Sequence, residues 1–271
     1  MLLSQTLKYL PAQLVGPAAQ FASVMIWTHL LVPAEFGAVA LVLATQELVF
    51  QICLFWWSSF VMRYAPARSS RSGGLRQIAN ENAILLASIA TQGVVATALL
   101  WLTHSEPTGW LWLATVAYTV SRGIMTHMAE RARAVGDILA YNLTNVLSSV
   151  AGLGIACGLV VAVSPTAASV LGGFALAQAV TLPPLWVRLY RRPIVRFDRD
   201  LLGRALAYSG PLLVSGSIGW GTVNGVRVVV ERIDGIQAVG LMSVGWSIGQ
   251  RLMSVAAMLV TAAAFPIAVR E

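Results

Sequence analysis

The sequence predicts an all-α polytopic membrane protein with eight transmembrane helices, a six-helix N-terminal bundle followed by the first two helices of a second bundle. Composition is the first observation behind this. Hydrophobic residues make up 57% of the 271-residue chain and charged residues only 11%, whereas soluble domains carry about 25% charged residues. The second observation is that the apolar residues form long stretches, as a bilayer core about 30 Å thick requires of each spanning helix.

The apolar stretches are separated by connections of two alternating kinds. Short turns follow the odd-numbered stretches, and segments rich in arginine follow the second, fourth and sixth. A cleaved signal peptide is the alternative for the first stretch, but Lys8 is the one basic residue before it, which is weak for a signal peptide. The predicted spans are 10–32, 37–61, 79–103, 109–129, 139–163, 167–187, 206–230 and 238–267.

Basic residues predict the orientation of the chain, because loops rich in Lys and Arg stay in the cytoplasm. Of the 18 basic residues, 14 fall on one predicted side, one falls on the other and three lie within spans. This split predicts that the N-terminus is cytoplasmic, and we expect the protein in a bacterial inner membrane. The 14 residues are Lys8, Arg63, Arg68, Arg71, Arg76, Arg131, Arg133, Arg188, Arg191, Arg192, Arg196, Arg199, Arg204 and Arg270.

A basic linker divides the chain unequally. We predict a six-helix lobe over 1–187, a cytoplasmic linker over 188–205 and an incomplete second lobe over 206–271. A faint internal repeat supports this division, since EFGAV at 35–39 is echoed by AVGL at 238–241. Parallel repeats are a recognised design of transporters. Because the second copy would stop after two helices, we expect the chain to be a truncated member of its class.

Polar residues inside the predicted spans are the candidates for function, because such residues are costly in lipid and usually face a cavity or a partner. Guanidinium groups bind phosphate oxygens through paired hydrogen bonds and keep their charge. Arginines meeting between helices would therefore suit an anionic headgroup, with an acidic residue to balance charge or couple an ion. The predicted cavity residues are Tyr118, Arg122, Asn224, Arg227 and Arg251, with Glu47 as the charge-balancing or ion-coupling residue.

Other interpretations of these residues stay open at this level. Arg227 could extend to the outer interface instead of into a cavity. Arg122 and Glu47 could simply pair with each other. The histidines His29, His104 and His127 are predicted to be interfacial, because they lie far apart near membrane edges. Tryptophans near predicted span ends are interpreted as interface anchors; they are Trp27, Trp56, Trp57, Trp110, Trp112 and Trp186.

No enzyme motif is present. The sequence has no G-x-x-x-x-G-K-[ST], no H-E-x-x-H and no G-x-S-x-G, which are the signatures of phosphate-binding loops, zinc proteases and serine hydrolases. Cys53 and Cys157 have no metal-binding spacing. We therefore predict no catalysis, no cofactor, no metal and no nucleotide. Nucleic acid is also excluded, because the basic residues lie between apolar stretches and not on one polar face.

Two segments carry a resemblance to a family. Residues 31–41, LVPAEFGAVAL, resemble the first periplasmic turn of polysaccharide-biosynthesis flippases, the O-antigen and exopolysaccharide branch of the multidrug/oligosaccharidyl-lipid/polysaccharide exporter superfamily. Residues 224–243 are similar to that family's seventh helix, in which an Asp-Arg pair precedes a short turn. Here Gly225 and Val226 stand before Arg227 where the family carries the Asp, so that acidic partner is missing at this position.

The resemblance implies two six-helix bundles in a V, a cationic central cavity and alternating access. It implies a flippase that moves undecaprenyl-diphosphate-linked oligosaccharide to the periplasmic leaflet, with membrane lipids and glycan-assembly proteins as further partners. One alternative is a cation-coupled multidrug exporter of the same superfamily, which would prefer acidic cavity residues. The other is a non-transporting membrane scaffold for glycan-assembly enzymes.

Overall fold

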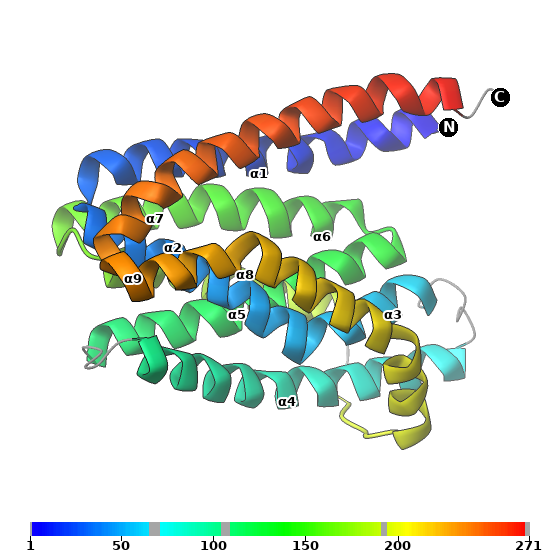
Figure 1. Ribbon diagram of the computed structural model, residues 1–271. Helices are drawn as coiled ribbons and strands as arrows, with labels where there is room; N and C mark the ends of the chain where they lie inside the picture. The colour runs from blue at the N-terminus through cyan, green and yellow to red at the C-terminus, as the bar shows by residue number, and fades with distance from the viewer. Residues whose placement is uncertain (1, 65–70, 104–108, 191–193, 269–271) are drawn as a thin grey trace.

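The computed structural model describes the backbone of residues 2–64, 71–103, 109–190 and 194–268, and the side chains of 14–64, 77–101, 109–190, 194–250 and 253. Helices fill this part of the chain and no strand occurs in it, which confirms the all-helical prediction. The helices lie side by side, mostly along one direction (Figure 1). They are α1 (Leu2–Leu30), α2 (Pro33–Phe50), the π-helix η1 (Gln51–Phe55), α3 (Trp56–Tyr64), α4 (Arg71–Thr103), α5 (Gly109–Val135), α6 (Ile138–Asn142), the π-helix η2 (Leu143–Leu147), α7 (Ser148–Ala162), α8 (Ala167–Tyr190) and α9 (Arg199–Ala268).

The predicted count of eight spans is not supported. Among the described residues, four helical stretches are long and apolar enough to cross a membrane, which indicates a membrane protein. Helix α5 is not among them, and its second half carries the charged residues Glu130, Arg131 and Arg133. The four candidate stretches are Pro33–Tyr64, Gln77–Trp101, Ile138–Ala162 and Ala167–Tyr190.

Helix α9 consists of two arms joined at Gly235. This residue has φ 81° and ψ 177°, a backbone conformation open to glycine because it has no Cβ. Figure 1 shows the ribbon running toward one end of the bundle and then returning along α1. The break falls inside the turn that the sequence places between Glu231 and Gln237. Two helical arms are thereby available to close one side of the bundle.

The two segments related by the internal echo lie against each other. A Cβ on Gly37 would clash with the carbonyl oxygen of Ile236, and a Cβ on Gly240 would clash with that of Pro33. Glycine at both positions lets the start of α2 and the second arm of α9 approach closely. This contact is reciprocal, because each echoed segment supplies one glycine and the residue four positions before that glycine supplies the carbonyl that the other glycine meets.

Two tryptophans predicted to anchor the protein at the interface are buried instead. Trp27 is 3% exposed and Trp57 is fully buried, so that interpretation is wrong for both. Trp57 packs in the main core cluster with Phe60 and Leu85. A helix end that the sequence places at the membrane surface can still face a neighbouring helix, and burying an indole ring there contributes much apolar area.

The prediction that His127 lies at the interface is also wrong. Its side chain is fully buried on α5 and contacts Glu81 of α4, with 2.8 Å between His127 Nε2 and Glu81 Oε1. Arg131, one turn further along α5, forms an ion pair with the other oxygen of the same carboxylate. Buried charges are paired in this way because an isolated ion inside a protein is very costly. His29, in contrast, is exposed.

A surface ion pair connects the α5–α6 turn to α8. Asp137 caps the first turn of α6 by accepting a hydrogen bond from the Ala140 backbone N–H at 3.0 Å. Its carboxylate also accepts two hydrogen bonds from the Arg188 guanidinium, at 2.7 and 2.9 Å. The Arg188 hydrogen bonds hold the pKa of Asp137 below its ordinary value. Asp137 therefore stays ionised at neutral pH, and this contribution to stability is lost as the pH falls through the lowered pKa.

Candidate functional site

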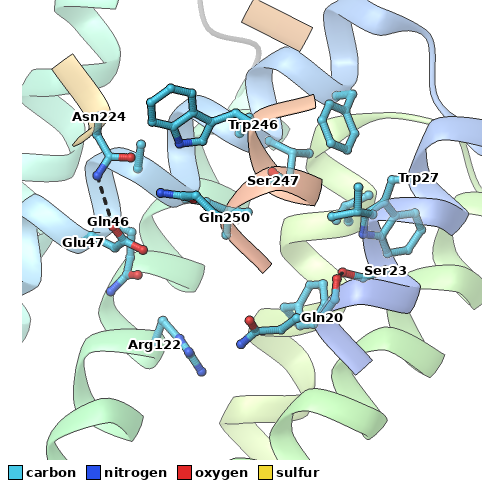
Figure 2. A pocket seen from close by; sticks show the side chains of 18 of the residues that line it. Gln20, Ser23, Trp27, Gln46, Glu47, Arg122, Asn224, Trp246, Ser247 and Gln250 are labelled. Atoms are coloured by element: carbon cyan, nitrogen blue, oxygen red, sulfur yellow. Dashed lines mark hydrogen bonds between the residues drawn. The ribbon is translucent and has the colours of Figure 1, made fainter. Parts of the chain in front are cut away.

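A cavity of about 950 Å³ lies between α1, α2, α5, α7, α8 and α9. This volume is at the upper end of the range of ligand sites, about 300–1,000 Å³. Figure 2 shows side chains from α1, α2, α5 and α9 around a common open space. The polar residues lining the cavity are Gln20, Ser23, Gln46, Glu47, Tyr118, Arg122, Ser148, Ser149, Gln178, Asn224, Arg227, Ser247 and Gln250.

The predicted site residues Glu47, Asn224 and Arg227 come together on one wall. Asn224 donates a hydrogen bond from Nδ2 to Glu47 Oε2 at 3.3 Å, drawn in Figure 2. Arg227 donates from Nη1 to Asn224 Oδ1. The Asn224 amide thus bridges the Glu47 carboxylate on α2 and the Arg227 guanidinium on α9. Arg227 is 8% exposed, so it does not extend to the outer surface as the alternative interpretation required.

A second contact fixes the first arm of α9 against α2 beside this wall. The indole N–H of Trp220 donates to the carbonyl oxygen of Ala44 at 2.7 Å. Ala44 lies three residues before Glu47, and Trp220 lies four residues before Asn224. The Trp220–Ala44 contact therefore lies one helical turn away from the Asn224–Glu47 contact. The Trp220 hydrogen bond therefore sets the register in which Asn224 meets Glu47.

Arg122 also lines the cavity, but among the described residues it forms no hydrogen bond with Glu47 or Asn224. Its side chain extends from α5 toward the cavity (Figure 2). Among the described residues, the structure gives its guanidinium no hydrogen bond, although Glu47 is near enough to interact with it electrostatically. With one carboxylate and two guanidinium groups, the described charges at this site sum to +1. An anion entering the cavity would find donors on Arg122 without first breaking a hydrogen bond between side chains.

Tyr118 stands one helical turn before Arg122 on α5 and lines the same cavity. It is 5% exposed, and its ring packs edge-on against Phe174 of α8, with ring centroids 6.4 Å apart. That contact holds α5 and α8 together behind Arg122. The side chain of Arg251, the sixth predicted site residue, lies outside the described residues, so its prediction stays untested.

The opposite wall was missed by sequence reasoning. It carries Gln20 and Ser23 from α1 and Trp246 and Gln250 from the second arm of α9, whereas Trp27, at 3% exposure, offers it little surface. Side-chain amides both donate and accept hydrogen bonds, and tryptophan faces are electron-rich, so they attract the weakly positive C–H faces of other groups. Sugar rings present hydroxyl groups at their edges and C–H groups on their faces. A wall of this composition therefore suits a carbohydrate.

A signal for this wall exists in the sequence. Gln20, Ser23 and Trp27 follow a spacing of three and four residues, which places them on one face of a helix. Ser247 and Gln250 have the same spacing on α9. Neither set stands out in the sequence, because its residues are uncharged and amides and hydroxyls are common in helices of membrane proteins.

Comparison with protein families, curated proteins and solved structures finds no match for this chain. Within the described residues, no three His, Cys, Asp or Glu side chains are placed to hold a metal ion.

Proposed function

We propose that the protein is a membrane transporter that moves an undecaprenyl-diphosphate-linked oligosaccharide from the cytoplasmic to the periplasmic leaflet of a bacterial inner membrane. It would belong to the polysaccharide-flippase branch of the exporter superfamily that residues 31–41 and 224–243 resemble. In this proposal the weaker span candidates α1 and α5 and the arms of α9 also cross the bilayer, and the N-terminus is cytoplasmic.

The observation that supports this proposal most is the position of Arg122. Its guanidinium faces the cavity and has no hydrogen bond among the described residues, so it is available for two parallel hydrogen bonds to a diphosphate. The amide and tryptophan wall opposite would contact the first sugars. The polyprenyl chain would stay in the lipid, because only the polar headgroup needs shelter from hydrocarbon.

Drug export coupled to a cation is less well supported. Such a site needs a carboxylate for a cationic substrate, and Glu47 already accepts a hydrogen bond from Asn224. The two guanidinium groups also leave the described charges of the cavity positive. Glu47 is then best explained as a group that balances the charge of Arg227 and Arg122 in the empty cavity.

Translocation in proteoliposomes tests the proposed function. The purified 271-residue chain is reconstituted with a fluorescent oligosaccharide on undecaprenyl diphosphate, and a membrane-impermeant quencher reports which leaflet the sugar occupies. We expect the protein to bring the labelled sugar of the inner leaflet to the outer leaflet, where the quencher reaches it. An uncharged prenyl-linked sugar should be translocated at least about tenfold more slowly than the diphosphate-linked one, the loss expected from about 1.4 kcal/mol of binding.

Two outcomes would contradict the proposal. If the quenched fraction equals that of protein-free liposomes, the chain does not translocate, and a scaffold role becomes the better explanation. If the charged and the uncharged probe move equally fast, the protein disturbs the bilayer without recognising the diphosphate.

A further inference from the structure

The buried carboxylate and imidazole on α4 and α5 form a second polar site, apart from the cavity. His127 contacts Glu81 through Nε2 and Ser58 through Nδ1, with Ser58 Oγ 2.7 Å from Nδ1. Glu81 and His127 are fully buried, and Ser58 is 2% exposed. Both nitrogens of the imidazole ring therefore have a partner, each from a different helix.

The Ser58 hydroxyl can serve His127 in either protonation state. Its Oγ lies 3.2 Å from the carbonyl oxygen of Leu54 as well as 2.7 Å from His127 Nδ1. When His127 is neutral and its proton is on Nε2, Ser58 donates to Nδ1. When a proton is added at Nδ1, that N–H donates to Ser58 Oγ and the hydroxyl proton turns to Leu54. The heavy atoms can keep their places in both states.

Glu81 supplies the counter-charge for such a proton. It interacts with His127, Arg131 and Tyr190, and the Tyr190 hydroxyl donates to Glu81 Oε1 at 2.9 Å. The guanidinium carbon of Arg131 also lies over the Tyr190 ring, 4.6 Å from its centroid. The described groups that face His127 are thus Ser58 of α3, Glu81 of α4, Arg131 of α5 and Tyr190 of α8.

The charge of this cluster depends on His127 alone. Glu81 and Arg131 balance each other, so the described groups sum to zero with a neutral imidazole and to +1 with a protonated one. Histidine is the side chain that changes charge between about pH 5 and pH 8. The Ser58 hydroxyl can turn between His127 and Leu54 without moving its oxygen, so proton uptake here would change charge at a fixed site.

The cluster and the cavity share two helices. His127 follows Arg122 on α5 by five residues, which is about 7.5 Å along a helix axis. Ser58 lies on the unbroken helical stretch Pro33–Tyr64, which also carries Glu47. A change of charge at His127 would therefore act electrostatically on the helices that carry Arg122 and Glu47.

We propose that His127, with Glu81 as counter-ion and Ser58 as the reversible partner, is a proton-binding site that takes up and releases one proton in each transport cycle. The bond that forms is Nδ1–H, and the proton comes from water and returns to it. This assigns ion coupling to His127 instead of Glu47. The coupling part rests on the proposed function, whereas proton binding is a property of the chain itself.

Proton binding is tested by ¹⁵N NMR of histidine-labelled protein in lipid bilayers. The variant His29→Gln/His104→Gln leaves His127 as the one histidine of the chain. We expect its ¹⁵N signals to pass from the neutral Nε2–H form to the imidazolium as the pH is lowered over the range in which the protein stays folded. A His127 signal that keeps one protonation state over this range, in folded protein, overturns the proposal.

Ser58 provides a second test that keeps both titratable groups. In Ser58→Ala the imidazolium N–H loses its acceptor, and hydrogen bonds of charged groups are the stronger ones. We therefore expect His127 to titrate at lower pH than in the parent, with Ser58→Thr restoring the parent curve. Identical curves for the parent and Ser58→Ala would show that the hydroxyl has no part in proton binding and would overturn the assigned site.

Coupling is tested by translocation under a pH difference of one unit. We expect the rate to follow the gradient in the wild-type chain and to be insensitive to it in His127→Gln, while the control His29→Gln behaves as wild type. Translocation by the wild type that ignores the gradient overturns the coupling. If no translocation occurs at all, the proposed function fails, and the NMR titration alone decides whether the proton site exists.

Discussion

Replacing Glu81 by alanine should lower the free energy of unfolding by about 3–5 kcal/mol, the usual cost of breaking a buried ion pair. The variant would leave Arg131 charged and buried, since its guanidinium carbon stays over the Tyr190 ring and its ion-pair partner is gone. It would also remove the acceptor of the Tyr190 hydroxyl. Chemical unfolding in detergent micelles measures the effect.

Glu130 is the matched control for this prediction. It forms an ion pair with Arg133 at 2.9 Å on the same helix as Arg131, but the Arg133 side chain is 51% exposed. Pairs of this kind contribute about 0–1 kcal/mol, so Glu130→Ala should unfold almost as wild type. Equal effects of the two substitutions would mean that the Glu81 cluster contributes no more than a surface pair.

Replacing Arg122 by glutamine should weaken binding of the diphosphate-linked glycan by about tenfold to a hundredfold, because hydrogen bonds to charged groups contribute about 1.5–3 kcal/mol. Arg122→Lys should give an intermediate loss, since lysine keeps the charge but cannot form two parallel hydrogen bonds. Fluorescence anisotropy with a labelled lipid glycan in micelles measures the dissociation constant.

The control for Arg122 is Arg133, an exposed arginine further along the same helix. Arg133→Gln removes the same charge from α5 without changing the cavity, so its affinity should stay within about twofold of wild type. If Arg122→Gln binds as tightly as Arg133→Gln, the diphosphate is held elsewhere, or by the net charge of the whole protein.

Much of the fold can be predicted from the sequence, because long apolar stretches separated by turns allow little besides helices. The number of spans cannot, since α5 combines an apolar first half with charged residues that are partly buried against other helices. Residues such as Arg131 look like loop residues when read along the chain, yet Arg131 is 5% exposed. Whether such a helix meets lipid or protein depends on its neighbours, which the sequence does not specify.

Half of the candidate site could be predicted in the same way. Ionisable residues inside apolar stretches are costly, and this argument finds Glu47, Arg122 and Arg227, which the fold brings to one cavity. It misses Trp27, whose position near a helix end is typical of an interface anchor. It also misses the proton site, because Glu81 and His127 lie 46 residues apart on different helices, and no local pattern links them.

The most direct test of the central claim is to locate the headgroup by photo-cross-linking. A photoreactive amino acid is placed at Ser247, which lines the cavity, or at Leu241, which is exposed on the same arm of α9 outside it. With a radiolabelled diphosphate-linked glycan, we predict labelling from position 247, little from position 241, and loss of the signal with Arg122→Gln. Equal labelling from both positions, or labelling from 247 that Arg122→Gln leaves unchanged, would contradict the account.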